Sequence, residues 1–283
     1  MTKRKTEYET YTAVADATVA KAVAKTASPF AIEVRFLGGL TPRQQTAFKR
    51  AADRWSKVIV GDLPSVQVGT DLIDDVLILA SGITIDGPGR ILGQAGPTRL
   101  RPASAGAAAF LPAKGQMQFD TADLADMETN GTLEDVITHE MGHVLGIGTI
   151  WTNKGLLTGA GGSNPTFRGA GAMREFGTLM NGAAQPVPVE NRGGPGTADS
   201  HWRESVFGTE LMTGIVAGAG NPMSRLTVAS LADLGYQVNL AAAEAYTLPS
   251  HLLMAVAGAF ASAPSGMVMP IIPTVLPDES LDV

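Results

Sequence analysis

An α+β fold built on a mixed, twisted β-sheet is the architecture that this 283-residue sequence predicts. Residues 30–37 alternate large apolar side chains with polar or small ones, which is the period of a half-buried strand. Residues 42–59 place apolar side chains at helical spacing, after a potential N-cap at Thr41 and a proline at the first helical position. Apolar runs at residues 76–80 and 91–94 predict two more strands, with the turn sequence GPG between them.

A short strand and a second helix are expected next. Residues 117–119 suggest the strand. The helix is expected to begin near Thr132, where the sequence TLED resembles a capping box with Asp in place of Glu. Gly146 or Gly148 is expected to end it, because helices commonly stop at glycine.

The sequence after this helix has a different composition. Residues 149–200 contain 11 of the 33 glycines and have poor periodicity, which predicts a loop-rich insertion with one short strand at residues 187–189. Another helix is expected at residues 224–234, closed by Gly235.

Four parts are therefore expected along the chain. Residues 1–28 form a tail or leader, for which disorder is the favoured interpretation. Residues 29–148 form an N-terminal subdomain that ends with the second helix, and residues 149–250 form the glycine-rich insertion and a C-terminal subdomain. Residues 251–283 form an apolar tail rich in Ala, Pro and Met, without a clear period.

Composition excludes several classes of protein. Hydrophobic residues make up 45% of the chain and charged residues 17%, so extensive disorder is not expected. A formal net charge of −6 argues against nucleic acid or an anionic membrane as a partner. No apolar run reaches the roughly 18 residues that a membrane span needs. The lack of cysteine removes disulfides, thiol catalysis and Cys-ligated zinc sites.

The motif that carries chemistry is HEMGH at residues 139–143, inside the second helix. His139 and His143 lie four positions apart, so one helical face presents both imidazoles to a single ion. The apolar residues opposite them are Leu133, Ile137, Met141, Val144 and Leu145. The helix is thus expected to pack its back into a core and to turn its histidines outward to a cleft. Two histidines on a solvated helix face are the alternative.

A zinc ion held by two histidines needs one more protein ligand. The compact motif HExxHxxGxxH would supply it at position 149, but this chain has Thr149 there. His201 and His251 are the remaining histidines, and His251 is expected to be a packed or surface residue. A carboxylate ligand, as in a gluzincin-type enzyme, stays open with the candidates Glu190, Glu204 and Glu210.

These motifs resemble the leishmanolysin-type metallopeptidases of the metzincin clan. The resemblance rests on residues 139–146, the long insertion, the sequence GPGTADSHW at residues 194–202 and the sequence ELM at residues 210–212. It covers roughly residues 115–236. It implies a zincin-like fold with an active-site helix, followed by a loop-rich C-terminal subdomain. It also implies one catalytic Zn²⁺. The implied site residues are the ligands His139, His143 and His201, the general base Glu140 and the Met-turn residue Met212.

The chain departs from protozoan and animal members of that family, which are rich in cysteine and kept latent by a propeptide cysteine. Without cysteine this chain cannot use that switch, and it looks like a compact prokaryotic or phage-like relative. Calcium is a possible second ion at Asp71, Asp74 and Asp75, but the spacing is not that of an EF-hand and a solvated loop is the favoured interpretation.

The function expected from the motif and the resemblance is that of a zinc endopeptidase acting on a polypeptide. The metal would lower the pKa of a bound water toward about 7, and Glu140 would take its proton. In the zincin plan an edge strand above the active-site helix pairs with extended substrate. The residues expected to form that strand are Gly115, Gln116, Met117, Gln118 and Phe119.

Other readings stay open. One is a zinc-binding protein with a binding or assembly role and little or only self-processing activity, which would cut its own N-terminal or C-terminal tail. The presence of Glu140 argues against a purely structural site. Trp202 is expected to pack against the site wall or to shield the metal, whereas Trp55 and Trp151 are expected to be structural. No Sec-type signal peptide is visible, yet an extracellular or released protein is expected, with a cytoplasmic location and the oligomeric state left open.

Overall fold

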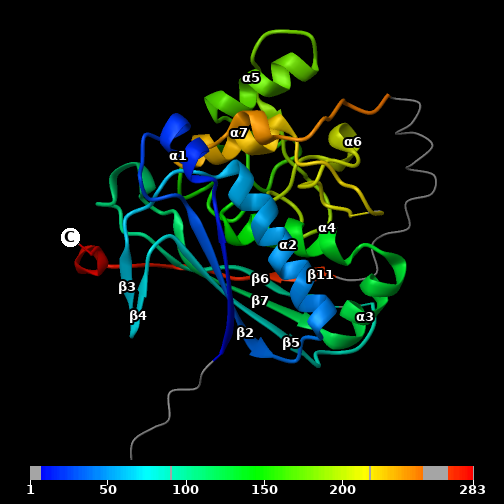
Figure 1. The fold of residues 1–283 in the computed structure, drawn as a ribbon. Helices are drawn as coiled ribbons and strands as arrows, with labels where there is room; N and C mark the ends of the chain where they lie inside the picture. Colours follow the sequence, from blue (N-terminus) through cyan, green and yellow to red (C-terminus); the bar gives the residue numbers. More distant parts are fainter. Residues whose placement is uncertain (1–7, 90, 217, 251–266, 283) are drawn as a thin grey trace, which may run out of the picture.

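A mixed β-sheet forms the lower half of the molecule in Figure 1, which shows a computed structural model that describes residues 8–89, 91–216, 218–250 and 267–282. Within these residues the strand order is β1-β2-β5-β7-β6-β11, and β12 also pairs with β6. The pairs β2·β5 and β5·β7 are parallel, whereas β1·β2 and β6·β7 are antiparallel. The strands are β1 (Glu9–Val14), β2 (Ala31–Gly38), β5 (Val76–Ile83), β6 (Ile91–Leu100), β7 (Pro112–Asp120), β11 (Met267–Pro270) and β12 (Thr274–Val275). This arrangement confirms the predicted α+β fold with a mixed sheet.

Two helices lie against each other and against this sheet, α2 (Pro42–Val58) and α4 (Leu133–Val144). The expected cap of α2 is present, because Thr41 and Gln44 bond each other's backbone N–H in a capping box. Between α2 and the sheet, Phe48 makes edge-to-face contacts with Phe36 and Phe119, with ring centroids 6.2 and 6.0 Å apart. The core therefore lies between α2 and the sheet, with α4 beside it.

The start of α4 differs from the prediction. Another helix, α3 (Thr121–Asn130), directly precedes it and ends at Gly131, which has a positive φ of 81°. The Thr132 side chain makes no cap bond to the backbone of α4 and instead donates to the Asn130 side chain at 2.6 Å. The predicted capping box is therefore wrong: the chain enters α4 through the turn that closes α3.

The residues after α4 are more ordered than expected. A small sheet of β8 (Leu157–Thr158), β9 (Thr166–Phe167) and β10 (Val187–Pro188) is followed by α6 (Glu204–Phe207) and α7 (Arg225–Leu234). The predicted helix at residues 224–234 is confirmed as α7. The sequence did not reveal α5 (Ala170–Leu179), because glycines at 171 and 177 lower its intrinsic helix propensity. Asp233 of α7 stabilises α5 by accepting from the N–H groups of Gly171 and Ala172, both at 2.8 Å.

Part of the expected N-terminal tail also belongs to the fold. Within residues 1–28, β1 adds an antiparallel edge to β2, and α1 (Ala17–Val23) is capped by Asp16. Ala20 of α1 is fully buried. The expectation of disorder is thus wrong for residues 8–28, because their apolar side chains find partners in the sheet and helices.

The predicted edge strand is an interior strand. The residues Gly115, Gln116, Met117, Gln118 and Phe119 all lie in β7, paired with β5 on one side and with β6 on the other. Both rows of backbone groups of β7 are therefore used, and extended substrate cannot pair with it. Gly115 also has no room for a side chain, since a Cβ would lie 2.3 Å from Val144 Cγ1. The prediction of a substrate strand at 115–119 is wrong, and the neighbouring β6 has β11 and β12 on its other side.

The C-terminal residues 267–282 return to the sheet. Strands β11 and β12 run parallel to β6, and Leu276 and Leu281 pack on a cluster beneath the sheet. A hairpin of β3 (Val66–Val68) and β4 (Asp71–Ile73) contributes to this cluster. His251 lies outside the described residues. Among those that are described, no helix is long and apolar enough to cross a membrane.

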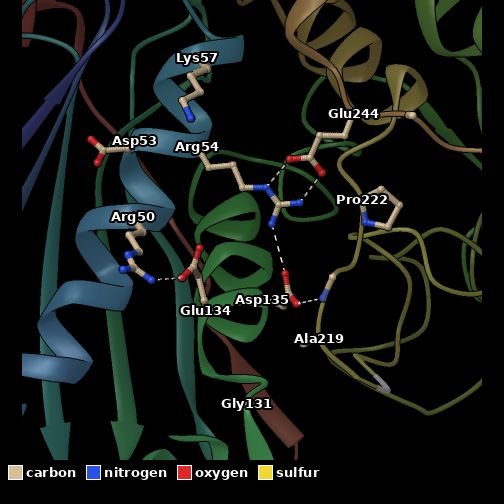
Figure 2. Close-up of a pocket in the computed structure, with 12 residues that line it drawn as sticks. Arg50, Asp53, Arg54, Lys57, Gly131, Glu134, Asp135, Ala219, Pro222 and Glu244 are labelled. Atoms are coloured by element: carbon tan, nitrogen blue, oxygen red, sulfur yellow. Dashed lines mark hydrogen bonds and ion pairs between the residues drawn. The ribbon is translucent and has the colours of Figure 1, made fainter.

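A polar groove of about 740 Å³ lies between α2, the start of α4 and the segment around residues 219–222. Figure 2 shows Arg54 of α2 reaching across it to Glu244, with donor–acceptor distances of 2.8 and 2.6 Å, and to Asp135 at 3.3 Å. Asp135 in turn accepts from the Gly220 N–H at 2.6 Å. These bonds join α2 and α4 to the segments around residues 220 and 244.

Replacing Arg54 by alanine is expected to lower the free energy of unfolding by about 2 kcal/mol, because it leaves two carboxylates without their cation in a partly buried place. The guanidinium side chain is only 18% exposed. Arg50→Ala is the matched control, because Arg50 is 65% exposed and its ion pair with Glu134 is worth about 0–1 kcal/mol. Urea denaturation of both variants checks this, and equal midpoints would contradict it.

Candidate metal centre

The rings of three histidines meet beside the C-terminal half of α4. His139 and His143 project from consecutive turns of α4, and His201 comes from the loop before α6. Their Nε2 atoms form a triangle with sides of 3.1 Å (His139 to His201), 3.0 Å (His139 to His143) and 2.9 Å (His143 to His201). The three side chains are more covered than the predicted outward-facing cleft implies, with only 5 to 7% of each residue exposed.

The other ring nitrogen of each histidine bonds a backbone carbonyl. His139 Nδ1 lies 2.7 Å from Leu211 O, and His143 Nδ1 lies 2.8 Å from Ile147 O. His201 Nδ1 lies 2.9 Å from Thr197 O. A carbonyl oxygen can only accept, so each Nδ1 carries the proton and each Nε2 keeps a free lone pair. This is the tautomer that a metal ligand needs, held by partners outside the ligand set.

Burial keeps all three rings neutral. Loss of solvent is the main cause that lowers the pKa of His139 to about 3 and that of His143 to about 4. It also lowers the pKa of His201 well below its ordinary value, with a further contribution from the two neighbouring rings. Neutral imidazoles with their lone pairs turned toward one another repel unless something positive lies between them.

The arrangement fits a divalent zinc ion. Tetrahedral zinc with Zn–N bonds of 2.0–2.1 Å separates its ligand nitrogens by about 3.3 Å, close to the observed triangle. The three Nε2 atoms belong to a group whose ligand atoms all lie within 4.8 Å of one another. Three imidazoles also leave a fourth position, which is the composition of catalytic rather than structural zinc sites.

Glu140 adds a carboxyl group to the same helix face. It lies three positions before His143, so the two side chains are neighbours on α4. Only 6% of Glu140 is exposed, and its Oε2 atom has no hydrogen-bond partner. Burial raises the pKa of Glu140 to about 8. The Oε2 atom of Glu140 therefore lacks a partner beside three imidazoles. A cation or a polarised water at the centre would supply that partner.

Met212 lies under α4 at the level of the two ligands. A Cβ placed on Gly142 would be 2.8 Å from Met212 Sδ and 2.9 Å from a ring carbon of Trp55, so only glycine fits at position 142 without displacement. The Met212 N–H donates to the buried Glu210 carboxylate at 2.6 Å, and its carbonyl accepts from Trp202 N at 2.9 Å. Since His139 bonds the carbonyl of the preceding residue, this turn supports the histidine directly.

None of the three carboxylates considered as a third ligand joins the histidines in the described part of the chain. Glu190 accepts from the N–H groups of residues 191, 192 and 204 at 2.9 Å each. Glu210 accepts from Ser224 and Thr227 as well as from the turn. Loss of solvent raises the pKa of Glu204 to about 7, but this residue too lies outside the group of ligand atoms. The geometry favours His201 over a carboxylate.

Sequence reasoning missed how the third histidine is held. A Cβ on Gly148 would lie only 2.0 Å from Ser200 O, and Gly148 has a φ of +75°. The chain leaving α4 therefore touches the residue before His201, backbone against backbone. Thr149, at the place of the compact motif's third histidine, donates to His143 O at 2.8 Å instead. Gly148, just after the motif, is a sequence signal for a close backbone contact, but no nearby residue indicates that Ser200 is the partner.

The tryptophans pack away from the centre. Trp202 is fully buried, stacks on Trp151 with ring centroids 4.8 Å apart and donates to Thr227 Oγ1 at 2.8 Å. Its ring also contacts Phe167 and Phe207, so it is packed among core aromatic residues and, within the described residues, makes no ring contact with the three histidines. Trp55 donates to Thr138 O at 2.9 Å on the back of α4. The structural roles predicted for Trp55 and Trp151 agree with this packing.

The acidic set considered for calcium is used otherwise. Asp71 forms ion pairs with Arg35 at 3.0 Å and with Lys114 at 2.9 Å. Asp75 is buried and accepts from the N–H groups of Ala31 and Leu63, both at 2.8 Å. Asp71 is therefore not brought together with the other two, whereas Asp74 and Asp75 lie with Asp62, one carboxylate oxygen of each within 4.8 Å of the others.

Comparison with known families gives one match. Residues 178–253 match the family model described as leishmanolysin, a peptidase family. The matched segment contains His201 and Met212, whereas the HEMGH motif lies before it. A comparison with curated proteins gives no match. This match confirms the predicted resemblance to a leishmanolysin-type metallopeptidase, and it does so from residues outside the HEMGH motif.

Proposed function

We propose that this leishmanolysin-type chain is a zinc-dependent endopeptidase that hydrolyses polypeptides. The observation that carries the proposal is the triangle of three Nε2 atoms with 2.9–3.1 Å sides, each ring oriented by a carbonyl behind it. The family match over residues 178–253 supports a metallopeptidase independently of that geometry.

His139, His143 and His201 would hold the zinc ion through Nε2. When bound, the ion supplies Lewis-acid chemistry: it polarises the scissile carbonyl and makes a water acidic enough to be deprotonated near neutral pH. The residues of the chain keep the three rings neutral, fix their tautomer and exclude bulk solvent. The turn at Leu211 and Met212 fixes the ring of His139 and fills the space beneath α4.

Glu140 is the proposed general base. Its unpartnered Oε2 would accept the proton of the attacking water and afterwards deliver it to the leaving amine. Burial makes the ionised Glu140 carboxylate a stronger base than an exposed one, so it would take up the proton of a polarised water more readily. The substrate would be an extended polypeptide. The enzyme would act outside the cell or after release from it.

Metal removal tests the proposal. The purified protein is expected to contain one zinc ion per chain and to cleave an unfolded protein. Dialysis against a chelator is expected to abolish both the metal and the cleavage, and one equivalent of Zn²⁺ to restore them. Metal analysis by mass spectrometry and gel-based cleavage measure this, with Mg²⁺ addition as the control. A protein that takes up no zinc, or that cleaves equally well without it, would refute the proposal.

A further inference from the structure

The outer edge of β6 is occupied by the chain's own C-terminal segment. On its inner side β6 pairs antiparallel with β7. On its outer side, Met267–Pro270 runs parallel to the first half of β6, from Ile91 to Ala95. Thr274 and Val275 pair with its end, opposite Arg99 and Leu100. Residues 267–275, called the C-terminal strap below, therefore follow the length of β6 and cover the edge that this end of the sheet would otherwise leave open.

The strap lies beside β6, one of the strands on which α4 packs. Val144, next to the ligand His143, packs on Gly115 of β7. Gly115 lies beside Gly96 of β6, whose outer side faces Ile271 of the strap: a Cβ on Gly96 would be 3.3 Å from Ile271 Cβ. Neighbouring strands are about 4.8 Å apart, so Ile271 lies two strand spacings from the point where α4 meets the sheet. Polypeptide paired to the edge of β6 would lie where the strap lies now.

Residues 276–282 join the strap to the rest of the fold. Beyond the strap, Leu276 N donates to Leu100 O at 2.8 Å, Asp282 N donates to Ser65 O at 2.9 Å, and Leu281 packs on the cluster beneath the sheet. Figure 1 shows this part crossing to the side of the sheet where β3 and β4 lie. Residues 276–282 are thus a firm anchor.

The strap itself is lightly held. Ile272 is 92% exposed, and Thr274 and Val275 are exposed as well. Pro270 and Pro273 have no N–H to give to the ladder. A lightly held strand that is tethered by an anchor has a high effective concentration at its docking edge, yet it can be displaced.

From these contacts we infer that the C-terminal strap competes, within the same chain, with extended substrate for the outer edge of β6. The expected consequence is that the strap inhibits peptide hydrolysis, and this consequence rests on the proposed peptidase function. Main-chain hydrogen bonds to a sheet edge bind any extended partner, so the strap and an unfolded substrate present the same chemistry to β6. Binding of one excludes the other.

The test compares Ile271→Asp with Ile272→Asp. Aspartate at 271 places a charge against the backbone of Gly96, whereas at 272 it points into solvent. Ile271→Asp is expected to raise kcat/KM on an unfolded protein about tenfold, because it increases the fraction of molecules with a free edge. Ile272→Asp is expected to match the wild type. Thr274→Pro, which disturbs the second pairing point, is a further variant that should behave like Ile271→Asp, and circular dichroism confirms that each variant is folded.

A binding measurement separates this inference from the proposed function. In a Glu140→Gln background, a fluorescent peptide of residues 267–276 is expected to bind about tenfold more tightly when Ile271→Asp is also present. Equal binding in both proteins, or equal kcat/KM for the 271 and 272 variants, would overturn the inference that the strap competes for the edge of β6. If no zinc-loaded protein cleaves anything, the proposed function fails, while the peptide-binding result still decides whether the strap occupies the edge.

Discussion

The Glu140→Gln variant is expected to keep one zinc ion per chain and to lose peptide hydrolysis by a factor of about 10²–10⁴, the range that general acid–base catalysis contributes. Glutamine has the same shape as glutamate, so it fills the buried position beside His143 without disturbing the ligands. It cannot take a proton from water. Zinc content by mass spectrometry and kcat/KM on an unfolded protein check the two parts of this expectation.

Glu134→Gln is the matched control for that variant. Glu134 lies on the same helix, but it is half exposed and pairs with Arg50, away from the histidines. Its loss is expected to change kcat/KM less than about twofold, in line with the small effect of exposed ion pairs. If Glu140→Gln cleaved as well as the wild type, the base would have to be another group. If it lost its zinc, Glu140 would be supporting the ligands instead.

The His201→Ala variant is expected to lose zinc, with an affinity reduced by more than about 100-fold, which is the largest effect usually seen for partners outside the ligand set. Only two nitrogens of the triangle would then remain, both on α4. Titration with Zn²⁺ by isothermal calorimetry measures the affinity, and circular dichroism verifies that the variant folds.

Two controls distinguish His201 from the other candidates. His251→Ala is expected to bind zinc as the wild type does, because three other histidines already complete the triangle. Glu204→Gln is expected to bind zinc normally as well, since its carboxyl group lies outside the cluster. If His201→Ala kept its zinc while a carboxylate variant lost it, the ligand set would be that of a gluzincin-type enzyme.

The parts of the structure that follow from local sequence were predictable. The helices α2 and α7 have a cap, a period and a stop signal within a few residues, and α4 has the period of its motif. The convergence of His201 on the motif also followed from sequence, but only through resemblance to a family. Nothing in the spacing of 58 residues between His143 and His201 predicts that they meet.

The order of strands was not predictable, because it depends on contacts between distant residues. Strand β6 contains two glycines and a proline among its ten residues, so it reads as a short strand with a broken end. Strand β7 reads as three residues but extends over nine, because pairing on both sides stabilises residues of low strand propensity. For this reason the sequence analysis took residues 115–119 of β7 for the substrate strand, although β7 lies inside the sheet. The carbonyl partners of the imidazoles are likewise invisible in sequence, since every residue has a carbonyl.

The contact between Gly148 and Ser200 makes the insertion modular. Its two ends meet backbone to backbone, so the loop between them is closed at its base whatever its length. At its tip, residues 158–164 are all exposed, and lengthening a flexible loop costs only about 0.6 kcal/mol for each doubling. Additions that keep the bonds of Gly161 to Asp199 and of Asn164 to Arg203, both at 2.8 Å, would therefore leave His201 in register with α4. Chains built on this plan can vary the surface next to the three histidines while the arrangement of the histidines stays the same.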